Sequence, residues 1–263
     1  MHVGRIAAAD NKHGFETIAP SVVQAPGQMF TPTGPQAHDV PRAIGRDELA
    51  GIMDDYVEAA RNAIRAGLDG VEVHAANGYL LHQFLDPTVN VRDDEYGGTP
   101  QQRARFVVEV ISAVAEAIGA ERVGVRLSPG NPLNGMGEQP GPDLQDTYRS
   151  VVDGISGLGL AYLSVLSVSQ EHLGALVADL RDRFAGPLVL DTPGASPTSL
   201  EVVERILADG VADVVAVGQA FVANPDLAER WRLGADLNAG DPSTYYGGDA
   251  RGYTDYPTLS AAS

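Results

Sequence analysis

The stretch VEVHAANGYLLHQFLDP, residues 71–87, carries signals for both the fold and the chemistry of this chain. It begins as a short apolar strand, in which Val71 and Val73 alternate with polar residues, and the strand runs into His74. Asn77 and Tyr79 follow within five residues. An imidazole, an amide and a phenol are therefore crowded together where a predicted strand ends, and their role depends on the fold around that strand end.

Helices and strands alternate from residue 45 onward. Residues 46–67 predict a helix that Gly67 ends, because apolar residues recur on one helical face: Leu49, Ile52, Met53, Tyr56, Ala60, Ala63 and Ile64. Residues 99–119 predict a second helix, with Pro100 near its start and Gly119 at its end. Further helices are expected near 143–158, 170–184, 198–208 and 225–233, and strands at 69–75, 122–129, 160–166, 187–191 and 212–218. Strands separated by single helices indicate parallel βαβ units.

The predicted fold class is an α/β barrel of the TIM (β/α)8 type. Repetition of the strand–helix unit every ~30–45 residues favours such a barrel over a doubly wound sheet. The segment HVGRI, residues 2–6, is a candidate sixth strand beside the five clear ones. We therefore expect an N-terminally truncated barrel with about six of the eight βα units. It would form a single domain over residues 1–263, with the Pro- and Gly-rich segment 7–44 as a long loop on the active-site side.

Composition excludes several classes of function. The formal net charge of −17 disfavours binding to nucleic acid or to an anionic membrane surface. The absence of cysteine excludes disulfides, thiolate metal sites and cysteine nucleophiles. No apolar run approaches the ~20 residues of a membrane span, and the N-terminus has no signal-peptide core, so we expect a cytoplasmic protein.

The residues that follow the first clear strand suit the activation of a carbonyl compound. In a barrel of this type, the carboxyl ends of the strands form the active-site face. His74 and Asn77 can both donate hydrogen bonds to one oxygen, and such a pair stabilises negative charge that develops there. Tyr79 can act as a general acid, since a phenol with a pKa near ~10 keeps its proton at neutral pH. The alternative is a core histidine with satisfied hydrogen bonds beside a turn built on Asn77–Gly78.

Other strand ends carry weaker signals. Arg126 lies inside the apolar strand 122–129, where a cation needs either an ion pair in the barrel interior or an anionic ligand, such as a heterocycle that becomes anionic on reduction. Gly194 and Gly218 follow the last two strands, where barrels of this type commonly bind phosphate, although turn glycines would give the same pattern.

Several known kinds of site are missing from the sequence. There is no GxSxG nucleophile elbow, no HExxH zinc motif and no P-loop, and we expect no metal. The only lysine, Lys12, is not on a predicted strand, which disfavours Schiff-base chemistry. Glu72 has no second carboxylate placed to form a glycosidase pair with it. A barrel lyase or hydrolase that acts on a phosphorylated substrate would share this fold, but the absence of a strand lysine and of a carboxylate pair disfavours it. It ranks a distant third, after the two hypotheses given below.

Four segments together resemble the Old Yellow Enzyme family of FMN-dependent ene-reductases. They are DGVEVHAANGYLLHQFLDPTVNVRDDEYGGTPQQRARF (69–106), RVGVRLSP (122–129), ANPDLAERW (223–231) and TYYGGDARGYTDYPTL (244–259). The opening segment, residues 1–21, is similar to the family's third-strand region, so the resemblance covers essentially the whole chain.

The resemblance implies an oxidoreductase that uses FMN, with NADPH or NADH as reductant, on a small-molecule activated alkene. His74 and Asn77 would hold the carbonyl or nitro oxygen of the alkene, and Tyr79 would deliver a proton to Cα after flavin N5 delivers hydride to Cβ. Arg126 would lie beside the N1 and O2 edge of the flavin, and Tyr253 would line the substrate pocket. The remaining cofactor-binding residues, near the phosphate, would be Gly194, Ala195, Ser196, Gly218 and Gln219.

Three departures from the family pattern leave a second hypothesis open. The chain begins at the family's third strand, Gln219 replaces an Arg, and the phosphate loop has Ser196 in place of a Gly, followed by Pro197, which has no N–H to donate. The first hypothesis is an FMN-dependent reductase of enones, enals and nitroalkenes. The alternative is a truncated or degenerate member with weak or no FMN binding and no catalysis. Such a chain would be either a gene-start artefact at Met1 or a barrel fragment completed by a partner chain or by homo-oligomerisation.

Overall fold

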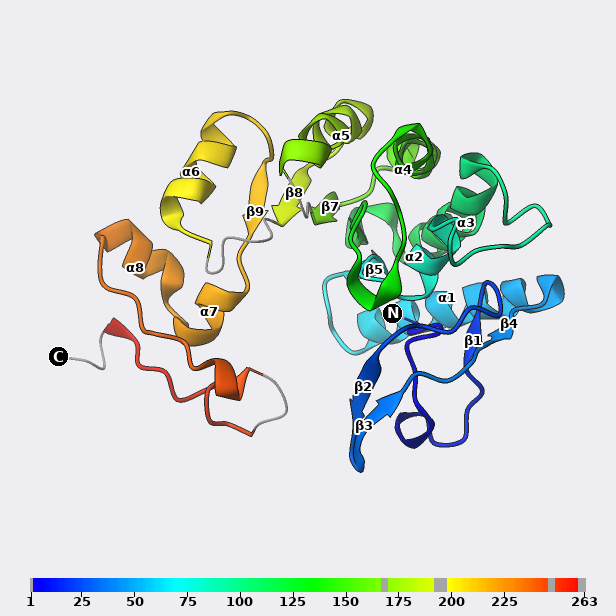
Figure 1. Ribbon diagram of the computed structural model, residues 1–263. Helices are drawn as coiled ribbons and strands as arrows, with labels where there is room; N and C mark the ends of the chain where they lie inside the picture. Colours follow the sequence, from blue (N-terminus) through cyan, green and yellow to red (C-terminus); the bar gives the residue numbers. More distant parts are fainter. Residues whose placement is uncertain (1, 167–169, 192–197, 246–248, 260–263) are drawn as a thin grey trace. The chain divides into compact units, whose positions relative to one another are not determined.

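A computed structural model describes residues 2–166, 170–191, 198–245 and 249–259 (Figure 1). The chain divides into two compact units, residues 1–189 and residues 190–263. Each unit is described by itself, and a single barrel domain over residues 1–263 stays a prediction.

The first unit is built on a parallel sheet. Its strands are β5 (Val71–Ala75), β6 (Val123–Leu127), β7 (Tyr162–Leu166) and β8 (Leu188–Asp191). The strand order β5-β6-β7-β8 is the order of the chain, and the pairs β5–β6 and β6–β7 are parallel. Each of these strands follows a helix, as the sequence pattern predicts for βαβ units.

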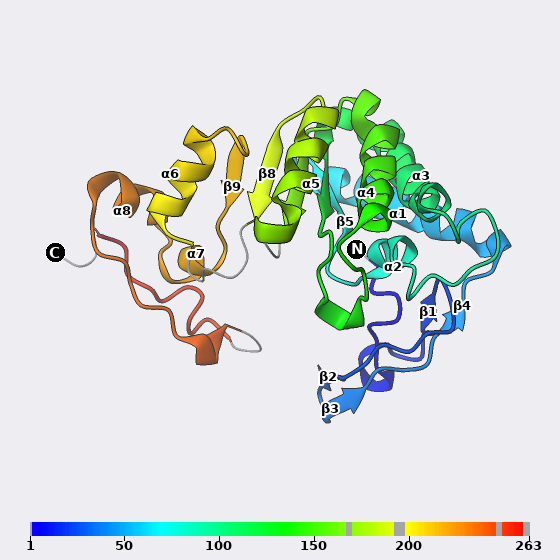
Figure 2. The ribbon, with the colours of Figure 1, turned by 45° about the horizontal axis from the view of Figure 1, so that its top comes forward.

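The long helices that precede these strands lie along one side of the sheet (Figure 2). They are α1 (Leu49–Arg65), α3 (Pro100–Ile118), α4 (Pro142–Ile155) and α5 (Gln170–Arg183), and each packs on the next in chain order. Helix α3 begins at Pro100 because Thr99 caps it: the Thr99 side chain accepts from Gln102 N, and the Gln102 side chain accepts from Thr99 N. The predicted helices 46–67, 99–119, 143–158 and 170–184 are confirmed within a few residues.

Side chains alternate between the two faces of the strands. Toward the helices, the strands present apolar residues that are at most 4% exposed: Val73, Ala75, Val125, Leu127, Leu163 and Val165. The intervening residues on β5 and β6 are polar or small: Glu72, His74, Gly124 and Arg126. Because successive side chains of a strand point to opposite faces, the apolar residues fix one face against the helices and leave the polar set on the other.

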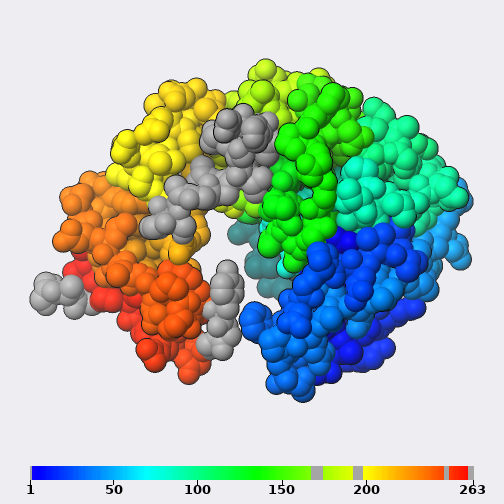
Figure 3. Space-filling model, in the orientation of Figure 1, coloured from blue at the N-terminus to red at the C-terminus, as the bar shows by residue number. Residues whose placement is uncertain are grey.

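The N-terminal segment differs from its prediction. Residues 2–6 form no strand, because Gly4 has a φ of +59° and Ile6 N donates to Val3 O, which makes a turn. Segment 7–44 is not a plain loop but contains β1 (Ile18–Ala19) paired with β4 (Arg42–Ala43), and a hairpin of β2 (Gln28–Thr31) and β3 (Gly34–Ala37). The hairpin projects from the rest of the first unit (Figure 3).

A short helix missed by the sequence reasoning follows β5. Helix α2 (Leu80–Leu85) has all six residues buried, so it lacks the polar face on which helical periodicity depends. Leu80 N donates to His2 O, and Gln83 donates to Val3 O, which ties the start of the chain to this helix.

The second unit contains α6 (Leu200–Ala208), β9 (Val214–Ala216), α7 (Gln219–Ala223) and α8 (Leu227–Leu233). The helices expected near 198–208 and 225–233 are confirmed, and α7 is an addition. Arg230 is 4% exposed and binds Asp226, Asp236 O and Pro257 O, so one guanidinium joins α8 to the C-terminal segment. Short 3-10 helices occupy Ala9–Asn11, Arg46–Glu48, Ala120–Arg122, Leu133–Gly135, Ser156–Leu158 and Pro242–Thr244.

In the described part of the chain, no helix combines the length and the apolar character that crossing a membrane requires.

A glycine on β6 makes room for an aromatic ring on β7. Gly124 pairs in register with Tyr162, and a Cβ at Gly124 would lie 2.2 Å from Cζ of the Tyr162 ring. The ring therefore lies directly over the backbone of β6, and this position needs a residue without a side chain.

We predict that Gly124→Ala lowers the free energy of unfolding by about 1–3 kcal/mol, because the ring must move from its place over β6. Urea unfolding followed by circular dichroism measures this. Gly157→Ala is the control, since a Cβ there meets nothing within 4 Å; we expect it to change stability by less than about 0.5 kcal/mol. Equal effects of the two changes would contradict the close packing of Tyr162 on Gly124.

Candidate active site

A polar layer crosses the sheet near the carboxyl ends of its strands. His74 on β5 pairs in register with Arg126 on β6, which pairs in turn with Ser164 on β7. Side chains at paired positions project from the same face. The register therefore brings an imidazole, a guanidinium and a hydroxyl together on the face opposite the helices.

The next row of paired residues on the same face, Glu72, Gly124 and Tyr162, contains the ion-pair partner of Arg126. Arg126 Nε lies 2.9 Å from Glu72 Oε1, and Tyr162 donates to Glu72 Oε2 at 3.0 Å. Both charged side chains are about three-quarters buried, at 23% and 28% exposed. Burial, and then the neighbouring Glu72 carboxylate, raise the pKa of Tyr162 to about 12, so the phenol keeps its proton. The interior ion pair expected as one alternative for Arg126 is thus present, while its contact with a flavin stays a prediction.

His74 is a neutral imidazole, and one of its ring nitrogens forms no hydrogen bond with the described residues. Burial, and then the positive charge of Arg126, lower the pKa of His74 to about 4. Its Nε2 is buried and has no hydrogen-bond partner within the described residues. The Tyr79 ring lies beside it, with ring centroids 5.5 Å apart. A buried polar atom without a partner is costly in a folded protein, and such atoms point to a ligand that supplies the missing bond.

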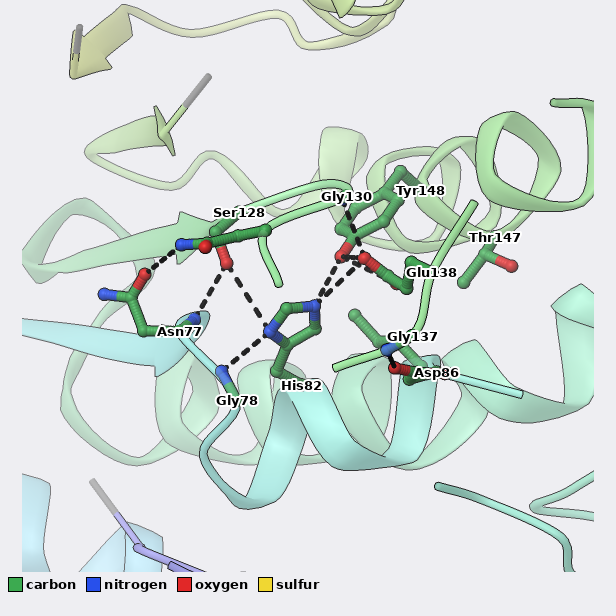
Figure 4. A network of polar contacts seen from close by, with 12 residues as sticks. Asn77, Gly78, His82, Asp86, Ser128, Gly130, Gly137, Glu138, Thr147 and Tyr148 are labelled. Carbon is green, nitrogen blue, oxygen red and sulfur yellow. Dashed lines mark hydrogen bonds and ion pairs between the residues drawn. The ribbon is translucent and has the colours of Figure 1, made fainter. Parts of the chain in front are cut away.

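Asn77 is held in a left-handed backbone conformation, with a φ of 57°. Its backbone N donates to Ser128 Oγ at 2.8 Å (Figure 4). Its carbonyl accepts from Asn134 Nδ2 at 2.7 Å. Its side-chain Oδ1 accepts from Asn131 Nδ2 at 2.9 Å. Because Oδ1 is the acceptor in that bond, the Nδ2 of Asn77 is the side-chain group left to donate to a ligand.

Tyr79 immediately precedes the buried helix α2 and is its N-cap residue. Its N–H donates to Ala76 O at 3.2 Å, and its carbonyl accepts from Gln83 N at 2.9 Å. The backbone of Tyr79 is thus fixed on both sides, which holds the phenol beside His74. Of the predicted trio, the structure brings the rings of His74 and Tyr79 together, and it holds Asn77 in the turn between them through Ser128, Asn131 and Asn134.

Sequence reasoning missed the residues that hold Asn77. Ser128, Asn131 and Asn134 all lie after β6, in the segment LSPGNPLNG. Ser128 directly follows a strand, so the rule that the carboxyl ends of parallel strands meet could have found it. Ser164 lies within a strand and gives no such signal; its buried Oγ also has no partner in the part of the chain that is described.

The remaining predicted residues belong to the second unit. Gly218 and Gln219 lie at the start of α7, and Gln219 Nε2 lies 3.4 Å from Tyr245 OH. Gln219 lines a cavity of about 340 Å³, together with α7 residues and the segment 237–245. Tyr253 is 51% exposed and donates to Tyr245 O. Gly194, Ala195 and Ser196 lie outside the described residues.

The sequence of this chain matches a family of flavin enzymes. The model of the NADH:flavin oxidoreductase / NADH oxidase family matches residues 1–238. A probable flavin mononucleotide-dependent alkene reductase of Leishmania infantum is 40% identical over 264 residues, which are 97% of this chain and 70% of that protein. The 12-oxophytodienoate reductase 2 of Arabidopsis thaliana is 36% identical, over 99% of this chain and 70% of that protein.

Solved structures agree with the sequence matches. Morphinone reductase is 40% identical, with a TM-score of 0.90 over 99% of this chain and 71% of its own. The Old Yellow Enzyme homologue of Zymomonas mobilis is 36% identical, with a TM-score of 0.89 over 98% of this chain and 72% of its own. Another structure holds morphinone reductase in complex with tetrahydroNAD; it is 41% identical.

These matches confirm the predicted fold class, part of a TIM barrel, and the resemblance to the Old Yellow Enzyme family. They also confirm FMN as the cofactor of the family, with NAD(P)H as reductant, and alkene reduction as an activity of its members. The family model covers most of the chain, and relatives about 40% identical are matched over some 70% of their own length, so the chain belongs to the NADH:flavin oxidoreductase / NADH oxidase family.

Proposed function

We propose that this chain reduces carbon–carbon double bonds activated by a neighbouring carbonyl or nitro group, as in enones, enals and nitroalkenes. One observation carries the proposal: at the end of β5, a neutral His74, whose buried Nε2 has no partner among the described residues, lies beside the Tyr79 ring, and Asn77 forms the turn between the two in sequence. That arrangement offers two donors for one oxygen and a phenol near them.

The polar layer of the sheet fits a flavin. A flat heterocycle with polar edge atoms would meet the Arg126 guanidinium and the buried His74 Nε2 and Ser164 Oγ, both of which have no partner among the described residues. When bound, FMN reduced by NAD(P)H supplies the hydride that adds to Cβ of the alkene. Arg126 would hold the N1 and O2 edge, and Glu72 fixes the guanidinium through Nε.

His74 and Asn77 would bind the carbonyl or nitro oxygen. In this role the imidazole proton would lie on Nε2, the buried nitrogen that has no partner among the described residues, so that it donates to the ligand. Asn77 would donate from Nδ2, since Asn131 occupies its Oδ1. Each donor strengthens as negative charge grows on the oxygen, which lowers the barrier to addition at Cβ.

Tyr79 would complete the reduction by giving its hydroxyl proton to Cα. Hydride at Cβ and a proton at Cα together saturate the double bond, and the tyrosinate then regains a proton from solvent. Tyr253 would line the substrate pocket, and Gly218 and Gln219 would lie toward the phosphate, as would Gly194, Ala195 and Ser196. Weak FMN binding with no catalysis is the competing outcome.

We predict that the purified chain retains FMN after incubation and desalting, as visible flavin absorption. Gln219→Arg should tighten FMN binding at least about tenfold, because an arginine adds charged hydrogen bonds to the phosphate. Gln101→Arg, an exposed change on α3, adds the same charge and should leave the dissociation constant unchanged. A colourless chain would refute the proposed function, and equal effects of the two variants would place the phosphate away from Gln219.

We predict that His74 titrates near pH 4 in the folded chain. The unfolded chain binds this proton at the ordinary pKa of 6.5, so unfolding takes up a proton between these values. The contribution of His74 to the free energy of unfolding is therefore complete above pH 6.5 and falls as the pH drops toward 4. An NMR titration of the ring protons measures the midpoint. Arg126→Gln should raise it, because the cation disfavours protonation of His74; a wild-type midpoint at 6.5 or above would refute the neutral donor.

We predict that Tyr79→Phe slows alkene reduction by about 10²- to 10⁴-fold, because the general acid is lost. Stopped-flow absorbance should show an unchanged rate of flavin reduction by NAD(P)H. Tyr96→Phe is the matched control: its hydroxyl binds Glu109, away from the site, and both rates should stay the same. Equal losses in the two half-reactions of Tyr79→Phe would exclude the proton-donor role.

A further inference from the structure

A buried polar cluster lies directly behind the Asn77 turn. We define the turn-anchoring cluster as His82, Ser128, Glu138 and Tyr148 (Figure 4). Three of its members have no exposed surface, and Glu138 is 8% exposed. None of the four takes part in the proposed chemistry, so their burial needs another explanation.

The cluster accepts hydrogen bonds from two consecutive backbone N–H groups of the turn. Asn77 N donates to Ser128 Oγ at 2.8 Å, and Gly78 N donates to His82 Nδ1 at 2.9 Å. Ser128 Oγ lies 3.5 Å from the same Nδ1, so the two acceptors also contact each other. The Asn77–Gly78 turn is thereby attached at two places, to Ser128 directly after β6 and to His82 on α2.

The hydrogen bonds fix the tautomer of His82. Because Gly78 N–H donates to Nδ1, that nitrogen carries no proton, and the ring proton lies on Nε2. Nε2 lies 3.1 Å from Glu138 Oε2, which also accepts from Gly130 N at 2.8 Å. Tyr148 donates to both oxygens of Glu138 at 3.0 Å. Burial, and then Glu138, raise the pKa of Tyr148 well above its ordinary value, so this donor stays protonated.

We infer that the turn-anchoring cluster positions Asn77 for the substrate oxygen, an inference that rests on the proposed function. Asn tolerates the left-handed conformation better than other residues with a side chain, but the conformation still competes with the commoner right-handed and extended ones, and the two backbone hydrogen bonds select it here. Without Ser128 and His82 as acceptors, the turn would relax and carry the Asn77 amide away from His74. Glu138 acts one step further out, by keeping the His82 proton on Nε2. These are positioning residues, since none of them reaches the reacting atoms.

Ser128→Ala tests the inference on the purified chain without reference to flavin. Hydrogen exchange followed by NMR should show the Asn77 and Gly78 amides exchanging at least about tenfold faster, because one acceptor is gone and local opening costs less. Ser150→Ala is the matched control: its hydroxyl binds Asp146 O within α4, and it should leave both amides as in the wild type. Exchange that is no faster in Ser128→Ala than in Ser150→Ala would overturn the inference.

The second measurement tells positioning from simple loss of structure. With FMN bound, Ser128→Ala should raise the KM for an enone about tenfold, while NAD(P)H reduces the flavin at a rate within about twofold of the wild type. If Ser128→Ala impaired enone reduction and flavin reduction equally, the inference that Ser128 positions Asn77 would be overturned. If the wild-type chain binds no flavin, the proposed function fails. The hydrogen-exchange rates of Asn77 and Gly78 still test whether the turn-anchoring cluster holds the turn.

If Ser128→Ala does not fold, Tyr148→Phe replaces it. This change removes one hydroxyl from Glu138 and should speed exchange at Gly78 severalfold. Unchanged exchange there would equally overturn the inference.

Discussion

The pairing register of β5 on β6 is the constraint on which the site depends. It sets His74 opposite Arg126 and Glu72 opposite Gly124. A slip of one residue would turn every side chain of β5 to the other face, which would bury His74 among the helices and expose Val73. The apolar residues that alternate with these polar ones pack against the helices and so fix the register. The packing of the helices therefore determines which charged groups lie next to one another on the opposite face. Arg126 then lowers the pKa of His74, which makes the imidazole a neutral donor.

Much of this arrangement follows from local sequence patterns. Strand and helix periodicity predicted the βαβ order, and the strand-end rule selected His74, Asn77 and Tyr79, of which the fold brings the rings of His74 and Tyr79 together. Patterns failed where no periodicity exists. Helix α2 is buried on every side, so nothing in its sequence distinguishes it from a buried strand. Segment 2–6 has the alternation of a strand but turns at Gly4, and a φ of +59° there cannot be inferred from residue type alone.

The more distant supporting residues of the site were beyond sequence reasoning for a different reason. Glu138 and Tyr148 lie far along the chain from Asn77 and not at a strand end, and their importance comes from hydrogen bonds that only the folded chain defines. Arg126 showed the same limit: a cation on an apolar strand required a partner, but only the register identified Glu72 as that partner. Residue chemistry therefore predicted which groups needed contacts, and the three-dimensional arrangement supplied their identities.

The turn at Asn77–Gly78 also bears on the chemical durability of the chain. An asparagine followed by glycine is the pair most prone to spontaneous deamidation, in which the glycine nitrogen attacks the side-chain carbonyl carbon and ammonia leaves. In this fold the Gly78 nitrogen is held by His82, and the Asn77 backbone is fixed by Ser128 and Asn134. Ring closure needs both groups to rotate, so the folded turn opposes it. The same contacts that orient the amide thus preserve it against ageing to a carboxylate, which would carry a negative charge and could not donate to a substrate oxygen.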